Sequence, residues 1–180
     1  MILRLAEPDD ALSVAHVHVR AWQTGYRGLL PDAYLDGLRA EDRASRYDLG
    51  NRDASRPQTI VALDAGAIRG FATVAPARDA DLIAHGELCA LYVDPDEWGR
   101  GIGAALVAAA RAHLYAAGFR DAVLWLLADN ARGERFYRSD RWLPDGQSRT
   151  DMVWGISVDE VRYCRALDAD VKMMTFARNA

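Results

Sequence analysis

The sequence predicts an α/β protein in which helices flank a mixed, mostly antiparallel sheet. Closely spaced apolar segments separated by short turns occupy residues 59–93, a pattern typical of an antiparallel meander. A strand, an apolar helix and a second strand follow within residues 87–127, and this order makes the two strands a parallel pair. Because 51% of the 180 residues are hydrophobic, the chain can bury one sizeable core.

The N-terminal half begins with a short apolar strand at residues 2–5. Pro8 then starts a helix that continues to about Trp22, with apolar residues at helical spacing. After a loop with two glycines, a second helix begins beyond Pro31. Three strands with a first turn at 64–66 are expected next, at residues 59–63, 68–75 and 87–93.

The C-terminal half alternates helices and strands. The expected elements are a helix at about 101–117, a strand at 122–127, a short helix from Asp129 to about Arg138, a strand from Trp142 and a last strand at 158–167. We therefore expect a single domain over residues 1–180, with a core at about 2–167 and a C-terminal extension at 168–180.

Charge and hydropathy exclude several partners. The formal net charge is −4, so no broad positive field exists to hold a nucleic acid or an anionic membrane. The most apolar helical segment, residues 102–117, is interrupted by Arg111 and His113 and is shorter than the roughly 20 residues that a membrane span needs. The N-terminus lacks a basic leader followed by an apolar stretch. We expect a cytoplasmic protein that binds neither nucleic acid nor membrane.

The strongest local signal lies in residues 93–106, where a strand passes through a loop into a helix whose first turn is rich in glycine. A helix start exposes unpaired N–H groups at the positive end of the helix dipole, which suits an anion. Gly99, Gly101 and Gly103 remove side chains that would keep a diphosphate from these donors. Arg100 adds a cation nearby.

Three classes of ligand use such a cradle. A nucleoside triphosphate loop would end in Gly-Lys-Ser or Gly-Lys-Thr, and this segment has no lysine. A dinucleotide site is closer, because Gly99, Gly101 and Ala104 satisfy its loose pattern and Asp121 follows twenty residues after Gly101. Five residues, however, separate the strand from Gly99, and Asp121 precedes its strand although the ribose-binding acid should end it. Coenzyme A is the third candidate.

The segment resembles the signature of the GNAT superfamily of N-acetyltransferases: Gln or Arg, two residues, Gly, any residue, then Gly or Ala, at the start of a long helix. Gly101-Ile102-Gly103 matches the glycine part, and Trp98 stands where the family usually has Gln or Arg. The order of elements is similar over about residues 2–167, most specifically over 87–143. The resemblance implies a GNAT-like sheet with a splayed central parallel pair, acetyl-CoA as co-substrate, no metal, and a possible homodimer.

The resemblance also implies a cofactor site. Main-chain groups of Leu91, Tyr92 and Val93 would hold the pantetheine arm and the acetyl carbonyl; otherwise these are only core strand residues. The diphosphate would lie on the loop formed by Gly99, Arg100, Gly101, Ile102, Gly103 and Ala104.

Asn130 and Tyr137 are seven residues apart, two turns and about 10 Å along one helix face. In the corresponding segment of the family the Asn contacts pantetheine and the Tyr hydroxyl lies near the sulfur. Tyr137 is therefore the expected general acid for the leaving thiolate. The alternative is that Asn130 is only a helix cap and that Phe136 and Tyr137 are a buried aromatic pair.

Attack on the thioester requires a neutral amine, so a base or a water chain must remove a proton. Glu87 is the best candidate, since it lies on the strand leading toward the cofactor and the family often has a Glu there. Strand alternation predicts that Glu87, Cys89, Leu91 and Val93 share one face, where burial would raise the pKa of Glu87. The alternative is a solvated residue at a strand start.

The acceptor is expected to enter beside the first two helices, where aromatic residues can hold an amine, although helix packing is the alternative role for each. The residues concerned are Trp22, Gln23, Tyr26 and Tyr34.

His16 and His18 are two residues apart and cannot share a helix face, so neither a metal pair nor a relay is indicated. Cys89 and Cys164 lack Cys-x-x-Cys spacing and are expected to be small buried residues.

The sequence therefore predicts an enzyme that transfers the acetyl group of acetyl-CoA directly to a primary amine of a small-molecule or peptide acceptor. Two alternatives remain at this point. One is a catalytically silent acyl-CoA-binding module, and the other is a dinucleotide-binding protein.

Overall fold

The computed structural model describes residues 1–167, and the predicted C-terminal extension at 168–180 lies outside the described residues. The elements in chain order are β1 (Ile2–Leu5), a 3-10 turn (Pro8–Asp10), α1 (Ala11–Gly25), α2 (Asp32–Gly37), α3 (Ala40–Ala44), β2 (Gln58–Asp64), β3 (Ala67–Pro76), β4 (Gly86–Val93), a second 3-10 turn (Pro95–Glu97), α4 (Ile102–Ala116), β5 (Asp121–Leu127), α5 (Ala131–Ser139), β6 (Leu143–Val153) and β7 (Ile156–Ala166).

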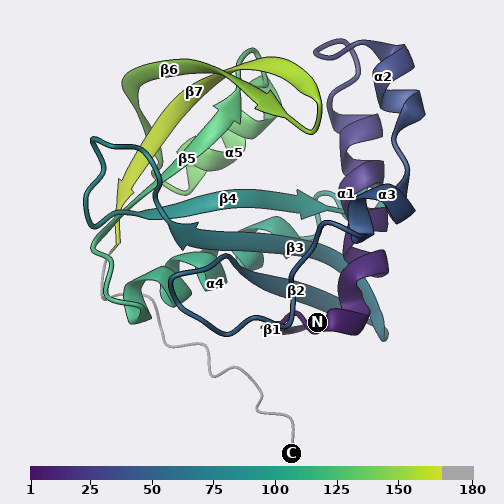
Figure 1. The fold of residues 1–180 in the computed structure, drawn as a ribbon, viewed down its shortest axis with the longest axis horizontal. Helices are drawn as coiled ribbons and strands as arrows, with labels where there is room; N and C mark the ends of the chain where they lie inside the picture. The colour runs from purple at the N-terminus through teal and green to yellow at the C-terminus, as the bar shows by residue number, and fades with distance from the viewer. Residues whose placement is uncertain (168–180) are drawn as a thin grey trace, which may run out of the picture.

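These strands form one sheet in the order β1-β2-β3-β4-β5-β7-β6. Every neighbouring pair is antiparallel except β4 and β5, which are parallel. Only Gly86–Ala122 and Glu87–Val123 are paired between β4 and β5, and Figure 1 shows the two strands diverging beyond this point. The predicted mixed, mostly antiparallel sheet with a splayed parallel pair is confirmed.

Helices cover both faces of the sheet (Figure 1). α4 packs on β2, β3 and β4, and its apolar face, including Leu106 and Leu114, is buried in the largest core cluster. α1 packs on the opposite face, against β3 and β4. A separate cluster there joins Trp22 of α1 to Leu35 of α2 and Val158 of β7. These two clusters lie on opposite faces of the sheet.

The start of α1 differs from the prediction. Pro8–Asp10 forms a 3-10 turn, in which the Asp10 carboxylate accepts the Glu7 N–H at 2.8 Å and pairs with Arg4 at 2.6 Å. α1 therefore begins at Ala11, and it continues to Gly25, beyond the expected end at Trp22. The short helix α3 was not predicted, because five residues are too few for a periodic signal.

A β-bulge interrupts the pairing of β3 with β4. Thr73 pairs with Ala90 while Val74 pairs with Leu88, so Cys89 is the extra residue. A bulge shifts the alternation of side chains along the strand. The prediction that Glu87, Cys89, Leu91 and Val93 share one face is therefore wrong.

The core clusters show the shifted alternation directly. Leu88, Leu91 and Val93 pack into the core beneath α4, whereas Ala90 and Tyr92 pack on the α1 side of the sheet. Within residues 1–167, every helix is too short or too polar to span a membrane.

Candidate functional site

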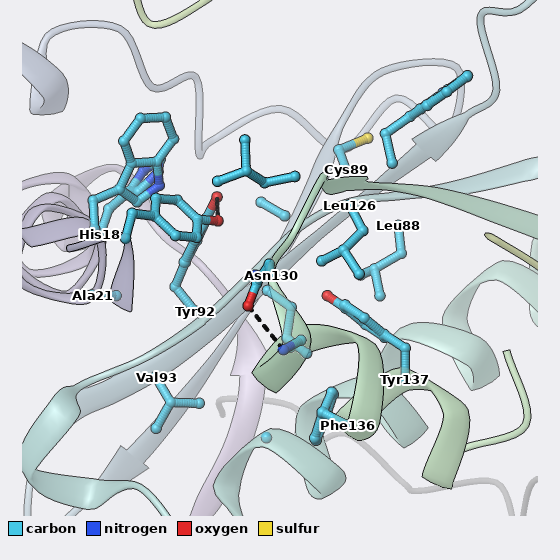
Figure 2. Close-up of a pocket in the computed structure, with 18 of the residues that line it drawn as sticks. His18, Ala21, Leu88, Cys89, Tyr92, Val93, Leu126, Asn130, Phe136 and Tyr137 are labelled. Carbon is cyan, nitrogen blue, oxygen red and sulfur yellow. Dashed lines mark hydrogen bonds between the residues drawn. The ribbon is translucent and has the colours of Figure 1, made fainter. Parts of the chain in front are cut away.

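A cavity of about 830 Å³ follows the gap between β4 and β5. Its walls come from these two strands, from the glycine loop before α4, from α5, from α1 and from the hairpin of β6 and β7. Figure 2 shows side chains from α1 and α5 approaching the cavity from different sides. The splay of the parallel pair leaves the end of β4 without a β5 partner, so its main chain faces the cavity.

Most residues that the sequence singled out line this cavity. They are Trp22, Tyr26, Glu87, Leu91, Tyr92, Val93, Gly99, Gly101, Ile102, Gly103, Ala104, Asn130 and Tyr137. Arg100, Gln23 and Tyr34 do not line it.

The glycine loop forms a cradle in which side chains would be costly. Gly99 and Gly101 have φ angles of 79° and 83°, in the left-handed region that favours glycine. Gly101 caps α4, so the free N–H groups of the first helical turn begin there. A Cβ on Gly103 would lie 3.3 Å from the ring of Phe136. Bare main-chain donors at a helix start fit a diphosphate group.

The Arg100 side chain lies outside the cavity lining and pairs with an acidic neighbour. Its guanidinium pairs with Glu97 at 2.9 Å, and its side chain is 68% exposed. The predicted cation of the loop is thus neutralised by an acidic neighbour three residues before it, and the cradle consists of main-chain groups.

Asn130 acts as a helix cap and also lines the cavity. Its Oδ1 accepts the N–H of Gly133 at 2.9 Å, which is drawn in Figure 2. Gly133 is required beside it, since a Cβ there would lie 2.8 Å from Asn130 Nδ2. Asn130 is therefore a helix cap, and the cap fixes its side chain at the wall of the cavity.

Tyr137 points its hydroxyl toward Leu126 in Figure 2, with Leu88 of β4 nearby. Its ring packs edge-on against Phe136, with ring centres 5.2 Å apart. Burial raises the pKa of the Tyr137 hydroxyl well above its ordinary value, with a smaller contribution from Tyr92. The hydroxyl is therefore protonated at neutral pH and can act as a hydrogen-bond donor in the cavity.

Glu87 is only 4% exposed, so the alternative of a solvated residue at a strand start is wrong. Burial raises the pKa of its carboxyl, while the positive charges of Arg78 and Arg149 act in the opposite direction. The negative charges of Asp79 and Glu160 add to the upward shift. A carboxylate with a raised pKa is a stronger base than an exposed one.

Two of the four predicted acceptor residues have structural roles. Gln23 donates from Nε2 to the carbonyl of Leu35 at 3.0 Å, which ties α1 to α2. Tyr34 donates its hydroxyl to the carbonyl of Trp154 at 2.8 Å, which ties α2 to the tip of the β6–β7 hairpin. Both hydrogen bonds join elements around the cavity, and neither Gln23 nor Tyr34 lines it.

The sequence did not indicate His18 as a site residue, although it lines the cavity with Arg43 and Trp154. The imidazole stacks on the ring of Tyr92, with centres 4.4 Å apart (Figure 2). A usable signal was present, because His18 and Trp22 are four residues apart and share a face of α1. Arg43 and Trp154 are far from His18 in the sequence, and only the tertiary fold brings them to the same cavity.

Cys89 is exposed to the cavity, so the prediction that it is a buried core residue is wrong. It is the bulged residue of β4, which accounts for its departure from the strand pattern. Desolvation by the surrounding protein nevertheless raises the pKa of its thiol to about 12, with the Glu87 charge as the next cause. The thiol is therefore protonated at neutral pH.

An extended cavity along a splayed parallel pair, lined at the glycine loop by a bare helix start, suits a long ligand that contains a diphosphate. The position of Asp121 at the start of β5 argues against a dinucleotide, whose ribose-binding acid should end the strand.

The chain belongs to the GNAT acetyltransferase family. The family model described as "Acetyltransferase (GNAT) family" matches residues 19–140. The N-acetyltransferase YuaI of Bacillus subtilis, itself uncharacterized, is 30% identical over 129 residues, which cover 71% of this chain and 72% of that protein.

Solved structures share the fold at lower identity. The ribosomal-protein-alanine N-acetyltransferase of Brucella melitensis superposes with a TM-score of 0.71 at 21% identity, covering 93% of this chain and 100% of that one. The paia N-acetyltransferase of Thermoplasma acidophilum, solved in complex with coenzyme A, has a TM-score of 0.65 at 18% identity, covering 89% and 98%.

Proposed function

We propose that this protein transfers the acetyl group of acetyl-CoA directly to a primary amine of a small-molecule or peptide acceptor. The observation that carries the proposal is the cavity in the β4–β5 gap, which joins the glycine cradle to Tyr137 and Glu87. Acetyl-CoA supplies an acetyl group activated as a thioester. The cradle at Gly101 would hold the diphosphate, and the main chain from Leu91 to Val93 would hold the pantetheine arm.

Glu87 would prepare the amine for attack. An alkylamine is protonated at neutral pH, and the carboxylate of Glu87 accepts that proton directly or through water. The neutral nitrogen then forms a bond to the acetyl carbon as the bond between carbon and sulfur breaks, and the second proton of the nitrogen passes, directly or through water, to the leaving sulfur, so the products are the amide and the free thiol of coenzyme A.

Tyr137 would act on the leaving group. As the bond between carbon and sulfur breaks, negative charge develops on sulfur, and the Tyr137 hydroxyl donates a hydrogen bond to it. The raised pKa of Tyr137 makes complete loss of its proton costly, so hydrogen-bond donation is the larger part of its contribution.

The test is an amine panel monitored by release of free thiol from acetyl-CoA, combined with thermal unfolding. We expect acetyl-CoA to raise the Tm, a reduced nicotinamide dinucleotide to leave it unchanged, and at least one amine to release thiol. Binding of acetyl-CoA without thiol release from any amine would favour the silent acyl-CoA-binding module.

A further inference from the structure

A cation and an imidazole adjoin each other on the α1 side of the cavity. Arg43 of α3 and His18 of α1 both line it. The Nε of Arg43 donates to Nδ1 of His18 at 3.3 Å. The guanidinium carbon lies 5.0 Å from the ring centres of both Tyr47 and Trp154. These aromatic rings hold the guanidinium in place and leave its positive charge intact.

No carboxylate neutralises Arg43. It takes part in no ion pair within residues 1–167, whereas Arg149 in the same cavity wall pairs with Glu160 at 2.8 Å and with Asp151 at 3.3 Å. Two further arginines line the cavity. Arg78 acts on the Glu87 carboxyl, whose pKa its charge lowers, and Arg132 lies over Trp98 beside the glycine loop. Among the four arginines that line the cavity, Arg43 is therefore the one on the α1 side whose charge is available to a ligand.

His18 supplies an unused hydrogen-bond donor at the same place. Its Nδ1 accepts from Arg43 and lies 2.7 Å from the Tyr47 hydroxyl, so the neutral ring carries its proton on Nε2. Burial lowers the pKa of His18 well below its ordinary value, with Arg43 as the next cause, and this keeps the ring neutral.

The Nε2 atom of His18 is buried and has no hydrogen-bond partner, in a side chain that is only 4% exposed. Buried donors are almost always paired in folded proteins, so an unpaired one in a cavity wall points to a ligand.

We propose that Arg43 and His18 form a subsite for an oxyanion of the acceptor, a carboxylate or a phosphate group, so that the acceptor carries an amine and an oxyanion in one molecule. This inference rests on the proposed function. The subsite belongs to the acceptor because it lies across the sheet from the pantetheine side: Leu91 and Tyr137 pack with α4, whereas Trp22 and Trp154 pack with α1. The indole rings beside it suit an apolar or aromatic acceptor body.

A binding experiment tests the subsite without turnover. Phenylacetate, benzylphosphonate and phenylacetamide are titrated by calorimetry into the protein saturated with coenzyme A. We expect at least one anion to bind about 10- to 100-fold more tightly than the neutral amide, the range for a charge-assisted hydrogen bond. The better anion identifies the oxyanion as carboxylate or phosphate. Equal binding of the amide, or no measurable binding of either anion at millimolar concentration, overturns the proposal.

Variants assign the effect to the two side chains. Arg43→Gln and His18→Phe should each remove most of the preference for the anion, while His18→Gln, which keeps an N–H donor, should retain part of it. Arg46→Gln is the matched control, because Arg46 is exposed and lies three residues further along. Unfolding curves check that each variant is folded. An unchanged preference in Arg43→Gln overturns the assignment.

A turnover experiment separates this inference from the proposed function. Thiol release is compared between phenylalanine and phenylalaninamide, and between 2-aminoethylphosphonate and ethylamine. Thiol release without preference for the anionic amines would overturn the subsite and leave the acetyltransferase proposal standing. Thiol release from none of them would count against the acetyltransferase proposal, and the calorimetry would still decide whether the oxyanion site exists.

Discussion

The guanidinium carbon of Arg132 lies 3.5 Å from the ring centre of Trp98, in a cation–π contact between α5 and the loop that precedes α4. Trp98 is fixed in turn, because its Nε1 donates to the carbonyl of Val93 at 2.9 Å. Both side chains line the cavity beside the glycine cradle. Trp98 occupies the position at which the family usually has Gln or Arg. Its contact with Arg132 of α5 places a positive charge beside the loop at this position.

Arg132→Ala should therefore weaken acetyl-CoA binding about 10-fold, the size of one charge-assisted contact. Trp98→Ala should weaken it similarly, and the double variant should lose little more, because the two side chains act as one unit. Arg135→Ala, an exposed arginine of the same helix, is the control. Titration of acetyl-CoA into the four variants measures the effect. If the fold-losses in acetyl-CoA affinity of the two single variants multiply in the double variant, Arg132 and Trp98 act independently.

Gly101→Ala tests the cradle. The φ angle of 83° places a new Cβ in a strained region, which costs about 1–2 kcal/mol in stability and disturbs the donors at the start of α4. Gly66→Ala is a matched control, since Gly66 has a φ of 79°, has equally open space and lies in the β2–β3 turn away from the cavity. Both variants should lower the Tm, and only Gly101→Ala should weaken acetyl-CoA binding. Equal affinity in the two variants would remove the loop from the cofactor site.

The fold, and the position of the glycine loop, Asn130 and Tyr137 in one cavity, were predictable because their signals are local. Gly101 and Gly103 mark a helix start by spacing alone, and Asn130 and Tyr137 share one helix face by their separation. The bulge at Cys89 was not predictable in this way. It depends on how β4 pairs with β3, and no residue type in the segment specifies it.

The α1 side of the cavity was harder to predict, because it is assembled from segments far apart in the chain. Arg43 comes from a helix too short to predict, and Trp154 comes from a hairpin tip. Residue type and nearness in sequence pointed to Gln23 and Tyr34, whereas the structure uses both side chains to join elements. Aromatic and amide residues serve packing as readily as binding, so composition alone does not separate the two roles.

Tyr137→Phe tests the assignment of the leaving-group donor. Loss of the hydroxyl should lower kcat about 100-fold, with little change in the KM for acetyl-CoA, since the hydrogen bond matters most as charge develops on sulfur. Tyr115→Phe is the control, because Tyr115 lies on α4 against Arg120 and outside the cavity lining. Steady-state kinetics measure both. A proportional rise in KM with unchanged kcat would mean that Tyr137 only binds the cofactor.

Cys89 is expected to be unreactive despite its exposure. A thiol with a pKa of about 12 has almost no thiolate at neutral pH, and the thiolate is the reactive form. Alkylation by iodoacetamide at pH 7.5, followed by mass spectrometry of the intact protein, should be much slower at Cys89 than for free cysteine. Cys89→Ser should retain acetyl transfer. A rapid reaction at Cys89, or loss of turnover in Cys89→Ser, would instead favour acetyl transfer through a covalent intermediate on Cys89.

Glu87→Gln tests the proposed base through its pH dependence. The carboxyl accepts a proton only when ionised, so activity should fall as the pH drops through its raised pKa, at a higher pH than for an ordinary glutamate. The variant should lose this acidic limb. Its kcat/KM should be about 100-fold lower near neutral pH, and the gap should narrow as the pH approaches the pKa of the amine itself. An acidic limb that survives in Glu87→Gln belongs to another group.

The same substitution should stabilise the fold, which separates a catalytic from a structural role. A carboxyl whose folded pKa is raised favours the folded state fully only below its unfolded pKa, and that advantage is lost as the pH rises through the folded pKa. Above that range the folded protein carries a buried ionised carboxylate, and Gln removes this cost. The Tm of Glu87→Gln should therefore exceed that of the wild type at neutral pH and converge with it in acid. Glu41→Gln, at an exposed position, should change neither the Tm nor the pH profile. A lower Tm in Glu87→Gln at neutral pH would mean that the carboxylate stabilises the fold, and its effect on turnover would then be indirect.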